Sequence, residues 1–240
     1  IKTSDGGYAI AGSTNSSGAG ASDFWLVKTD SVGNMEWNRT YGGTQNDYGD
    51  CVVQTDDGGY AIAGTTFSYS ITNGDFWLVK TNSTGDMEWS RNYGGWNRDE
   101  AHSVIQTSDG GYAVVGRSWG QGSGWYDFWL VKTNSTGYME WSRTYGGTNN
   151  DYCYSVIQTS NGGYALSGVT NFGAEGDFWL VKTNSTGNME WSRTYGGPNF
   201  DAGCCVIQTS DSGYALAGPT LSFGAGNWDF YLVKTFADGS

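Results

Sequence analysis

The chain has 240 residues, of which 24 are Asp or Glu and 12 are Lys or Arg, so its formal net charge is −12. This charge argues against nucleic acid as a partner, because a polyanion is repelled and the sequence contains no basic stripe. The sequence also contains no apolar run long enough for a transmembrane helix and no signal peptide, so we expect no membrane insertion.

A unit of about 50 residues is repeated nearly five times along the chain. One marker is a Tyr that follows a Gly and begins an apolar run, at Tyr8, Tyr60, Tyr112, Tyr164 and Tyr214. A second is Asp-Phe-Trp-Leu-Val-Lys-Thr, which starts at Asp23, Asp75, Asp127 and Asp177 and returns with Tyr in place of Trp at Asp229. A third is Met-Glu-Trp, at Met35, Met87, Met139 and Met189. A period of this length predicts an array of supersecondary units that bury their apolar faces against one another.

Each repeat reads as strands joined by tight turns. In the third repeat the expected strands are residues 101–107, 112–116, 127–133 and 138–145. They are rich in aromatic and β-branched residues, and turns containing Gly, Asn, Asp and Ser separate the first from the second and the third from the fourth. No window has a sustained helical period, so the sequence predicts an all-β fold.

Four antiparallel strands per repeat, arranged radially, are typical of a β-propeller blade. The sequence therefore predicts a single β-propeller domain over residues 1–240, with five four-stranded blades. The repeats are residues 1–43, 44–95, 96–147, 148–197 and 198–240. The last blade is incomplete, since it has no Met-Glu-Trp strand. Either residues upstream of Ile1 supply the missing strand, or the chain is one part of a longer array.

The motifs DGGYAIAG, DFWLVKT, MEW and TYGG resemble the repeats of large extracellular β-propeller proteins of archaea and bacteria. The blade is also similar to delta-60-type and PQQ-type repeats. The resemblance covers the whole chain and implies the fold, an extracellular or cell-surface location and no shared catalytic motif. Nothing in the sequence marks a quinone site, and vicinal Cys204 and Cys205 are only a weak hint of one.

Polar repeats suggest further local roles. Lys80 and Arg91, and their equivalents in the third repeat, are expected to form ion pairs on the outer strands, with Glu88 and Glu140 across the strand. Asn-x-Ser/Thr sequons occur at Asn15, Asn38, Asn82, Asn134 and Asn184. They are either glycosylation sites, which require an extracellular setting, or good turn chemistry.

The cysteines are expected to be small inner-strand residues, with Cys51 and Cys205 buried. A disulfide between Cys153 and Cys204 of adjacent blades is the alternative. No Cys/His pattern indicates zinc, so no cofactor or metal site is predicted. An inward ring of carboxylates would suit Ca²⁺, but no contiguous Asp-rich loop supports one.

The variable loops hold the candidate ligand-binding residues. The aromatic candidates are Phe67, Tyr69, Trp96, Trp119, Trp125, Tyr126, Phe172 and Trp228, and the links between blades add Asp47, Asp99, Asp151 and Asp201. Aromatic plates beside amide and carboxylate acceptors suit a sugar, whose C–H face stacks on a ring while its hydroxyls form hydrogen bonds. For the repeated Asp set the structural alternative is favoured, in which these residues cap backbone N–H groups.

These features favour a non-catalytic extracellular binding or adhesion module, with glycans or a cell-surface protein as partner, because near-equivalent repeated sites give avidity. A purely structural cell-surface building block is the first alternative. A glycosidase is the second, and it is disfavoured because the repeated Asp residues have no distinct environments to separate acid from base. The segment with Trp96, Arg98, Glu100 and His102 departs most from the other repeats and is the first place to expect an asymmetric site.

Overall fold

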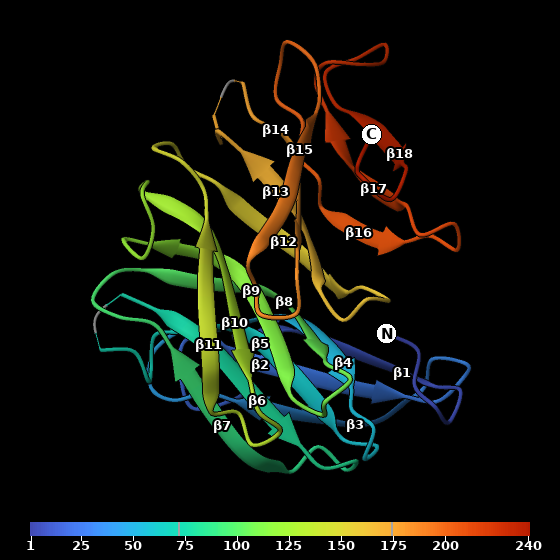
Figure 1. The fold of residues 1–240 in the computed structure, drawn as a ribbon. Coiled ribbons are helices and arrows are strands. Elements are labelled where there is room, and N and C mark those ends of the chain that lie inside the picture. The colour runs from blue at the N-terminus through green and yellow to red at the C-terminus, as the bar shows by residue number, and fades with distance from the viewer. Residues whose placement is uncertain (72, 174) are drawn as a thin grey trace. The chain divides into compact units, whose positions relative to one another are not determined.

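The computed structural model describes residues 1–71, 73–173 and 175–240, and the described residues form β-strands and connecting loops without a helix. The strands make five sheets that follow one another along the chain (Figure 1). Strand order within each sheet equals chain order, so every strand pairs with its neighbour in sequence. This is the arrangement that short strands joined by tight turns predict.

The first sheet contains β1 (Tyr8–Thr14), β2 (Asp23–Thr29) and β3 (Met35–Tyr41). The second contains β4 (Asp47–Gln54), β5 (Tyr60–Thr66), β6 (Asp75–Thr81) and β7 (Met87–Tyr93). The third contains β8 (Asp99–Gln106), β9 (Tyr112–Trp119), β10 (Tyr126–Thr133) and β11 (Met139–Tyr145). The fourth contains β12 (Tyr152–Gln158), β13 (Tyr164–Thr170), β14 (Asp177–Thr183) and β15 (Met189–Tyr195). The fifth contains β16 (Cys205–Gln208), β17 (Tyr214–Thr220) and β18 (Asp229–Thr235).

The Asn-Ser-Thr-Gly turns set the hairpins between the third and fourth strands of the blades. Asn134 Oδ1 accepts hydrogen bonds from the backbone N–H groups of Thr136 and Tyr138, at 3.0 and 2.9 Å. Gly137 adopts a φ of +78°, which a residue with a Cβ rarely adopts. The Asn therefore closes the turn and the Gly supplies its left-handed position.

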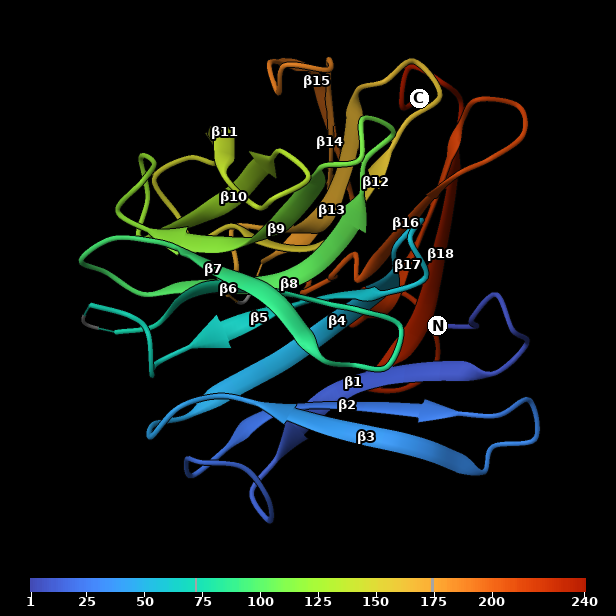
Figure 2. The same ribbon diagram turned by 90° about the horizontal axis from the view of Figure 1, so that it is seen from below.

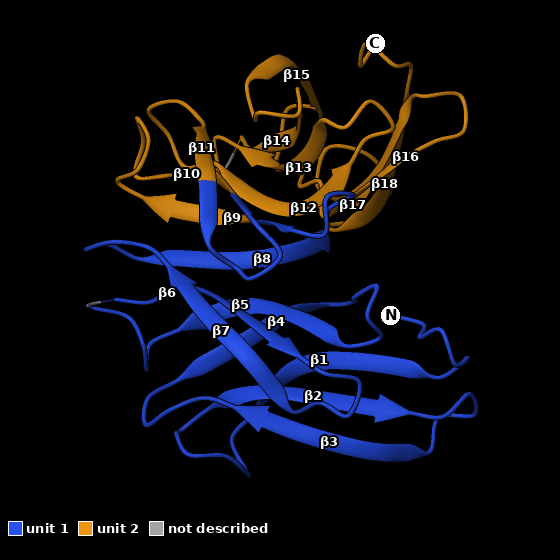
Figure 3. Ribbon diagram, turned by 60° about the horizontal axis from the view of Figure 1, so that its bottom comes forward, with its two compact units in different colours: residues 1–114, 132–140 blue, residues 115–131, 141–240 orange. Residues whose placement is uncertain are grey.

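The chain divides into two compact units, which Figure 3 colours separately. Unit 1 comprises Ile1–Val114 and Lys132–Glu140, and unit 2 comprises Val115–Val131 and Trp141–Ser240. The division passes through the third sheet. The assignment of residues 1–240 to a single domain stays a prediction.

Aromatic side chains fill the space between neighbouring sheets within each unit. In unit 1, β4 packs against β1 and β2 (Figure 2), and the Phe24 and Trp77 ring centroids are 4.6 Å apart. In unit 2, Phe128 and Trp179 are 4.7 Å apart in the same arrangement. Trp77 and Trp179 therefore lie between blades.

The Tyr of each Tyr-Gly-Gly motif connects one sheet to the next. Tyr41 Oη donates to the carbonyl of Gly85 at 2.6 Å, and Tyr145 Oη donates to the carbonyl of Gly187 at 2.6 Å. Each acceptor is the turn glycine of the following sheet. Because the hydroxyl is buried and bonded, it satisfies a carbonyl that would otherwise lose its contact with water.

The predicted pairing of lysine with glutamate on the outer strands is confirmed. Lys80 Nζ lies 2.8 Å from both Glu88 and Asp57, and Lys132 forms the same cluster with Glu140 and Asp109. The expectation for the arginines was wrong. The guanidinium carbon of Arg91 lies 5.8 Å from the Trp89 ring centroid and 4.5 Å from that of Tyr138, so the arginine covers aromatic rings.

The cysteine predictions are corrected in two respects. All four cysteines are free thiols, so Cys153 and Cys204 form no disulfide. Cys153 is buried, whereas Cys51 is half-buried and Cys205 is exposed, because Cys205 begins the short strand β16. Separately, none of the described residues forms a helix long and apolar enough to span a bilayer.

Candidate functional site

The aspartates that recur in every link between blades are buried hydrogen-bond acceptors. Asp47 accepts from the Thr66 hydroxyl at 2.5 Å, from the Ser68 hydroxyl at 2.7 Å and from the Gly43 N–H at 2.9 Å. The other members, all at most 1% exposed, are Asp99, Asp151 and Asp201. These carboxylates organise the link between blades and do not face solvent, which agrees with their structural reading.

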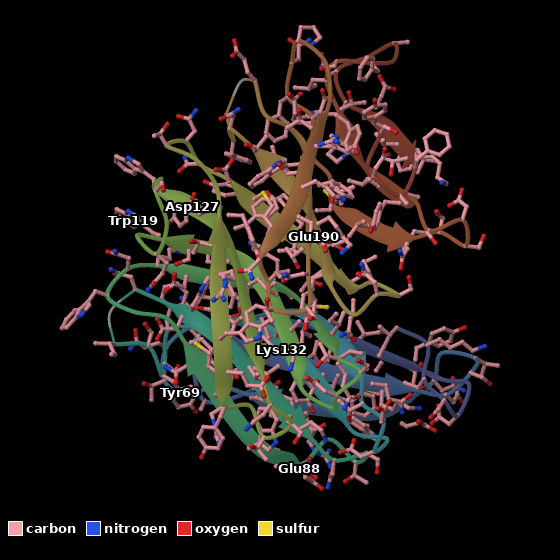
Figure 4. The ribbon with its side chains drawn as sticks, in the orientation of Figure 1. Tyr69, Glu88, Trp119, Asp127, Lys132 and Glu190 are labelled. Carbon is pink, nitrogen blue, oxygen red and sulfur yellow. The ribbon has the colours of Figure 1, made fainter. Side chains whose placement is uncertain are left out.

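The predicted aromatic residues of unit 2 lie next to one another in a continuous strip. We name this strip the aromatic row, and its members in order are Trp125, Trp119, Tyr126, Tyr152, Phe172, Phe200 and Trp228. Neighbouring ring centroids are between 4.2 and 6.0 Å apart. Its second member, Trp119, is the last residue of β9 (Figure 4), and the row continues over strand ends and loops of the next two blades. The sequence had identified five of these rings and had not connected them through Tyr152 and Phe200.

Two cavities lie along the aromatic row and share Phe172. The first, of about 280 Å³, is lined by Trp125, Thr148, Asn149, Asn150, Asn171 and Phe172. The second, of about 450 Å³, is lined by Phe172, Gly173, Asn199, Phe200, Leu221 and Trp228. Both combine exposed rings with asparagine amides. This combination suits stacking and directional hydrogen bonding to a sugar.

The three remaining aromatic candidates lie in unit 1. Phe67 lies under the Arg98 guanidinium, 5.5 Å from the ring centroid to the guanidinium carbon. Tyr69 packs on Trp77 at 5.2 Å and donates its hydroxyl hydrogen to the Gly42 carbonyl at 3.0 Å (Figure 4). Trp96 is 77% exposed. Tyr69 is thus fixed over a blade, while Trp96 projects into solvent.

Unit 1 also holds a pair of carboxylates on neighbouring inner strands, Asp50 on β4 and Glu100 on β8. The β4–β5 ladder pairs Gly49 with Gly64 and Cys51 with Ala63, so Asp50 is the unpaired residue of a β-bulge. Bulges re-aim side chains and occur frequently beside active sites. Glu100 is 7% exposed and forms an ion pair with Arg98. The two carboxylates therefore stand in different surroundings.

The surroundings of Asp50 change its proton affinity. It lines a cavity of about 280 Å³ together with Ile1, Ala9, Ile10, Ala11, Cys51 and Val52. Asp50 is exposed to water, yet these apolar neighbours remove part of its solvation. This desolvation, together with the negative charge of Glu100, raises the pKa of Asp50 to about 7. At neutral pH Asp50 is partly protonated and can donate a proton.

The repeat pattern itself contains a signal for this pair. Alignment of the inner strands places Asp50 beside His102, Tyr154 and Cys204, and it places Glu100 beside Tyr48, Tyr152 and Ala202. These two positions vary from repeat to repeat, whereas the neighbouring link aspartate does not. The sequence reading had weighed the repeated aspartates as catalytic candidates and had missed Asp50, although it had noted Glu100 in the most divergent segment. Asp50 and Glu100 therefore lie at positions where the repeats differ in sequence, and these differences give the two carboxylates different surroundings.

Comparison with known proteins gives no match to any protein-family model. The regulatory protein FlaEY of Caulobacter vibrioides is 31% identical over 126 residues, which is 46% of this chain and 13% of that protein. The chain therefore matches only a small part of that relative's length.

Among solved structures, a candidate exo-beta-1,3-galactanase from Bifidobacterium bifidum s17 has a TM-score of 0.51 at 13% identity, covering 98% of this chain and 90% of that one. An alpha-L-arabinofuranosidase from Clostridium thermocellum has a TM-score of 0.48 at 12% identity, covering 98% and 89%. The beta-1,2-mannobiose phosphorylase of Listeria innocua has a TM-score of 0.48 at 14% identity, covering 90% and 67%.

These comparisons bear on the fold and on the functional hypothesis. The likeness to the Bifidobacterium structure supports the predicted fold, an all-β propeller of repeated sheets. The hypothesis of a non-catalytic binding module, and with it the conclusion that the protein is not an enzyme, is contradicted, because the structure that shares this fold is named as a galactanase. The sequence argument failed because it treated repetition of the scaffold as repetition of the site.

Proposed function

We propose that this chain is a carbohydrate-active enzyme of the glycoside-cleaving kind, with Asp50 and Glu100 as its catalytic carboxylates. The observation that carries the proposal is the placement of two carboxylates in unlike environments on adjacent inner strands of unit 1. Glycosidic cleavage requires one carboxyl group that donates a proton and a second that acts as base or nucleophile. The fold shared with a candidate galactanase supports the same reaction class.

The division of roles follows from the environments. Asp50, with a pKa of about 7, is the general acid, and its O–H donates to the oxygen of the leaving sugar. Glu100 forms an ion pair with the Arg98 guanidinium and acts as the base or the nucleophile. His102 follows two residues later on β8, at the position aligned with Asp50, and adds a polar group to this strand.

Sugar binding is proposed for the aromatic row of unit 2. Its exposed members, with Trp125 at 67% and Trp228 at 58%, offer open ring faces for the C–H surface of a pyranose. The asparagines of the first cavity offer amide donors and acceptors for sugar hydroxyls. An extended glycan, which contacts several rings at once, is the ligand class that a row of this kind suits.

The location of the protein follows from such a substrate. Many polymeric glycans lie outside the cell, which fits the extracellular or cell-surface setting that the resemblance to extracellular repeat proteins implies, and we place the protein there. In that setting the sequons at Asn82, Asn134 and Asn184 are glycosylation candidates, since each lies in a hairpin turn at the molecular surface.

Single substitutions test the catalytic assignment. Asp50→Asn and Glu100→Gln keep the shape of each side chain and remove its acid–base function, so each is expected to lower kcat by about 10²- to 10⁴-fold. The matched control is Asp56→Asn, which changes an exposed carboxylate in the turn after β4. The assay is release of reducing ends from the best glycan substrate. Retention of wild-type kcat in both variants would remove the pair from the mechanism.

A further inference from the structure

Aspartate pairs recur at four links between blades. In each pair, an aspartate that begins a DFWLVKT strand stands near the aspartate of the next link. The pairs are Asp23 with Asp47, Asp75 with Asp99, Asp127 with Asp151, and Asp177 with Asp201. The two carboxylates of each pair approach the same glycine. At Gly146, for example, a Cβ in ideal geometry would lie 1.8 Å from Asp127 Oδ1 and 2.7 Å from Asp151 Oδ2. Gly42, Gly94 and Gly196 show the same pattern, so both carboxylates point at one place in every link.

One oxygen in each pair has no hydrogen-bond donor within the described residues. Asp127 is 1% exposed, and its Oδ2 accepts from the Gly124 N–H at 3.0 Å, while its Oδ1 is buried without a partner. The same unpartnered Oδ1 occurs in Asp23, Asp75 and Asp177. A buried carboxylate oxygen that lacks a donor is costly, so a repeated arrangement of this kind points to a missing positive partner.

The second aspartate does not supply that partner. Asp151 Oδ1 accepts from the Thr170 hydroxyl at 2.5 Å and from the Asn171 N–H at 3.0 Å, and its Oδ2 accepts from the Gly147 N–H at 3.0 Å. These donors occupy both carboxylate oxygens of Asp151. Burial and the neighbouring charge of Asp151 raise the pKa of Asp127, and burial and Asp201 do the same for Asp177. Each pair thus brings two carboxylates together, and in three of the four pairs both aspartates are buried.

The atoms that could act as ligands indicate which kind of ion would bind. The described residues contain no group of three or more His, Cys, Asp or Glu that would hold a metal, so the other ligands must be backbone carbonyls and water. At two of the links, carbonyl oxygens gather at the glycine whose N–H donates to the first aspartate. Those of Gly147 and Asn149 lie 2.8 and 2.4 Å from the ideal Cβ position of Gly124, and the Gly124 N–H donates to Asp127 Oδ2. Gly20 meets the carbonyls of Gly43 and Gln45 in the same way beside Asp23. A set made only of oxygens from loops suits Ca²⁺.

We propose that each of these four aspartate pairs binds one calcium ion, which joins the end of one blade to the start of the next. The inference is independent of the proposed enzymatic reaction, because none of these aspartates belongs to the Asp50–Glu100 pair. It also revises the sequence analysis, which had considered Ca²⁺ only for an inward ring of carboxylates. The ion would neutralise charge in a protein whose formal net charge is −12.

The test is a count of bound ions on the intact chain, by equilibrium dialysis against CaCl₂ followed by metal analysis and by native mass spectrometry. The wild type is expected to hold about four Ca²⁺ per chain, one for each pair. Asp127→Asn is expected to hold one fewer. The matched control is Asp229→Asn, because Asp229 has the same tether, from the Gly226 N–H at 3.2 Å, but no second aspartate converges with it at a glycine among the described residues. This control is expected to keep the wild-type count.

Two results would overturn the proposal. The first is an equal count in the wild type and in Asp127→Asn, with circular dichroism confirming that both are folded. The second is absence of bound Ca²⁺ at millimolar concentration together with a higher Tm of Asp127→Asn at pH 8 in EDTA, which would mean that the pair shares a proton. A Tm of the wild type that falls on addition of EDTA, with a smaller fall in Asp127→Asn, would support the calcium sites.

Discussion

Asp50 illustrates how a single residue acquires a role that its repeat does not have. Its equivalents along the chain are His102, Tyr154 and Cys204, so no other blade places a carboxylate at this bulge. The bulge removes Asp50 from the β4–β5 ladder, and apolar neighbours desolvate it. Such a residue is typical of a functional site. Its raised pKa lowers the stability of the folded protein at neutral pH, but it keeps a proton available there for catalysis.

The stability of the folded protein should report this cost. Folding raises the pKa of Asp50 from 3.8 to about 7, so the stability contributed by the protonated form is present below pH 4 and is lost as the pH rises through about 7. Asp50→Asn cannot ionise. We therefore expect its Tm to exceed that of the wild type at pH 8, and the difference to close as the pH falls toward 4. Equal Tm differences at both pH values, measured by thermal denaturation, would contradict the raised pKa.

At the scale of the element, a hairpin is held by a lysine between two acidic side chains. Lys132 is buried on β10 (Figure 4). It bonds Asp109 in the turn between β8 and β9 and Glu140 on β11. Burial opposes ionisation of Asp109, but the hydrogen bonds from Lys132 and Thr107 outweigh it and lower its pKa to about 2. The cluster therefore links three strands of a blade through one charge.

Removal of this charge should be costly where the lysine is buried. Lys132→Met leaves two carboxylates without their cation, and we expect the free energy of unfolding to fall by roughly 2–4 kcal/mol. Lys234 is the matched control, because its side chain is 46% exposed and it pairs with Asp211 alone. For Lys234→Met we expect a loss below about 1 kcal/mol. Urea denaturation at pH 7 measures both, and equal losses would refute the role assigned to burial.

The strands themselves were predictable because their signals are local. The third repeat was expected to hold strands at residues 112–116 and 127–133, and β9 and β10 occupy Tyr112–Trp119 and Tyr126–Thr133. Gly turns, Asn-Ser-Thr-Gly hairpins and alternating apolar residues fix such elements within a few residues of sequence. The bulge at Asp50 was not predictable, because it depends on the register between two strands.

Along the whole chain, the structural motifs repeat from blade to blade, but the candidate sites do not. The links and hairpins repeat in each blade, whereas the carboxylate pair occurs in unit 1 and the aromatic row in unit 2. Sequence reasoning found the row's exposed rings, such as Trp125 and Trp228, since variable loops on a rigid fold carry binding residues. It did not include Tyr152 and Phe200 among the candidate rings, because they join the row only through contacts between neighbouring blades.

The proposed cleavage of glycans is tested by measuring reducing-end release from a panel of soluble polysaccharides. We expect turnover of at least one polysaccharide by the wild type, with a rate that falls as the pH rises above about 7, where Asp50 loses its proton. The double variant Asp50→Asn/Glu100→Gln is the blank, since it retains the aromatic row. No release above that blank from any glycan, at any pH between 5 and 8, would contradict the claim.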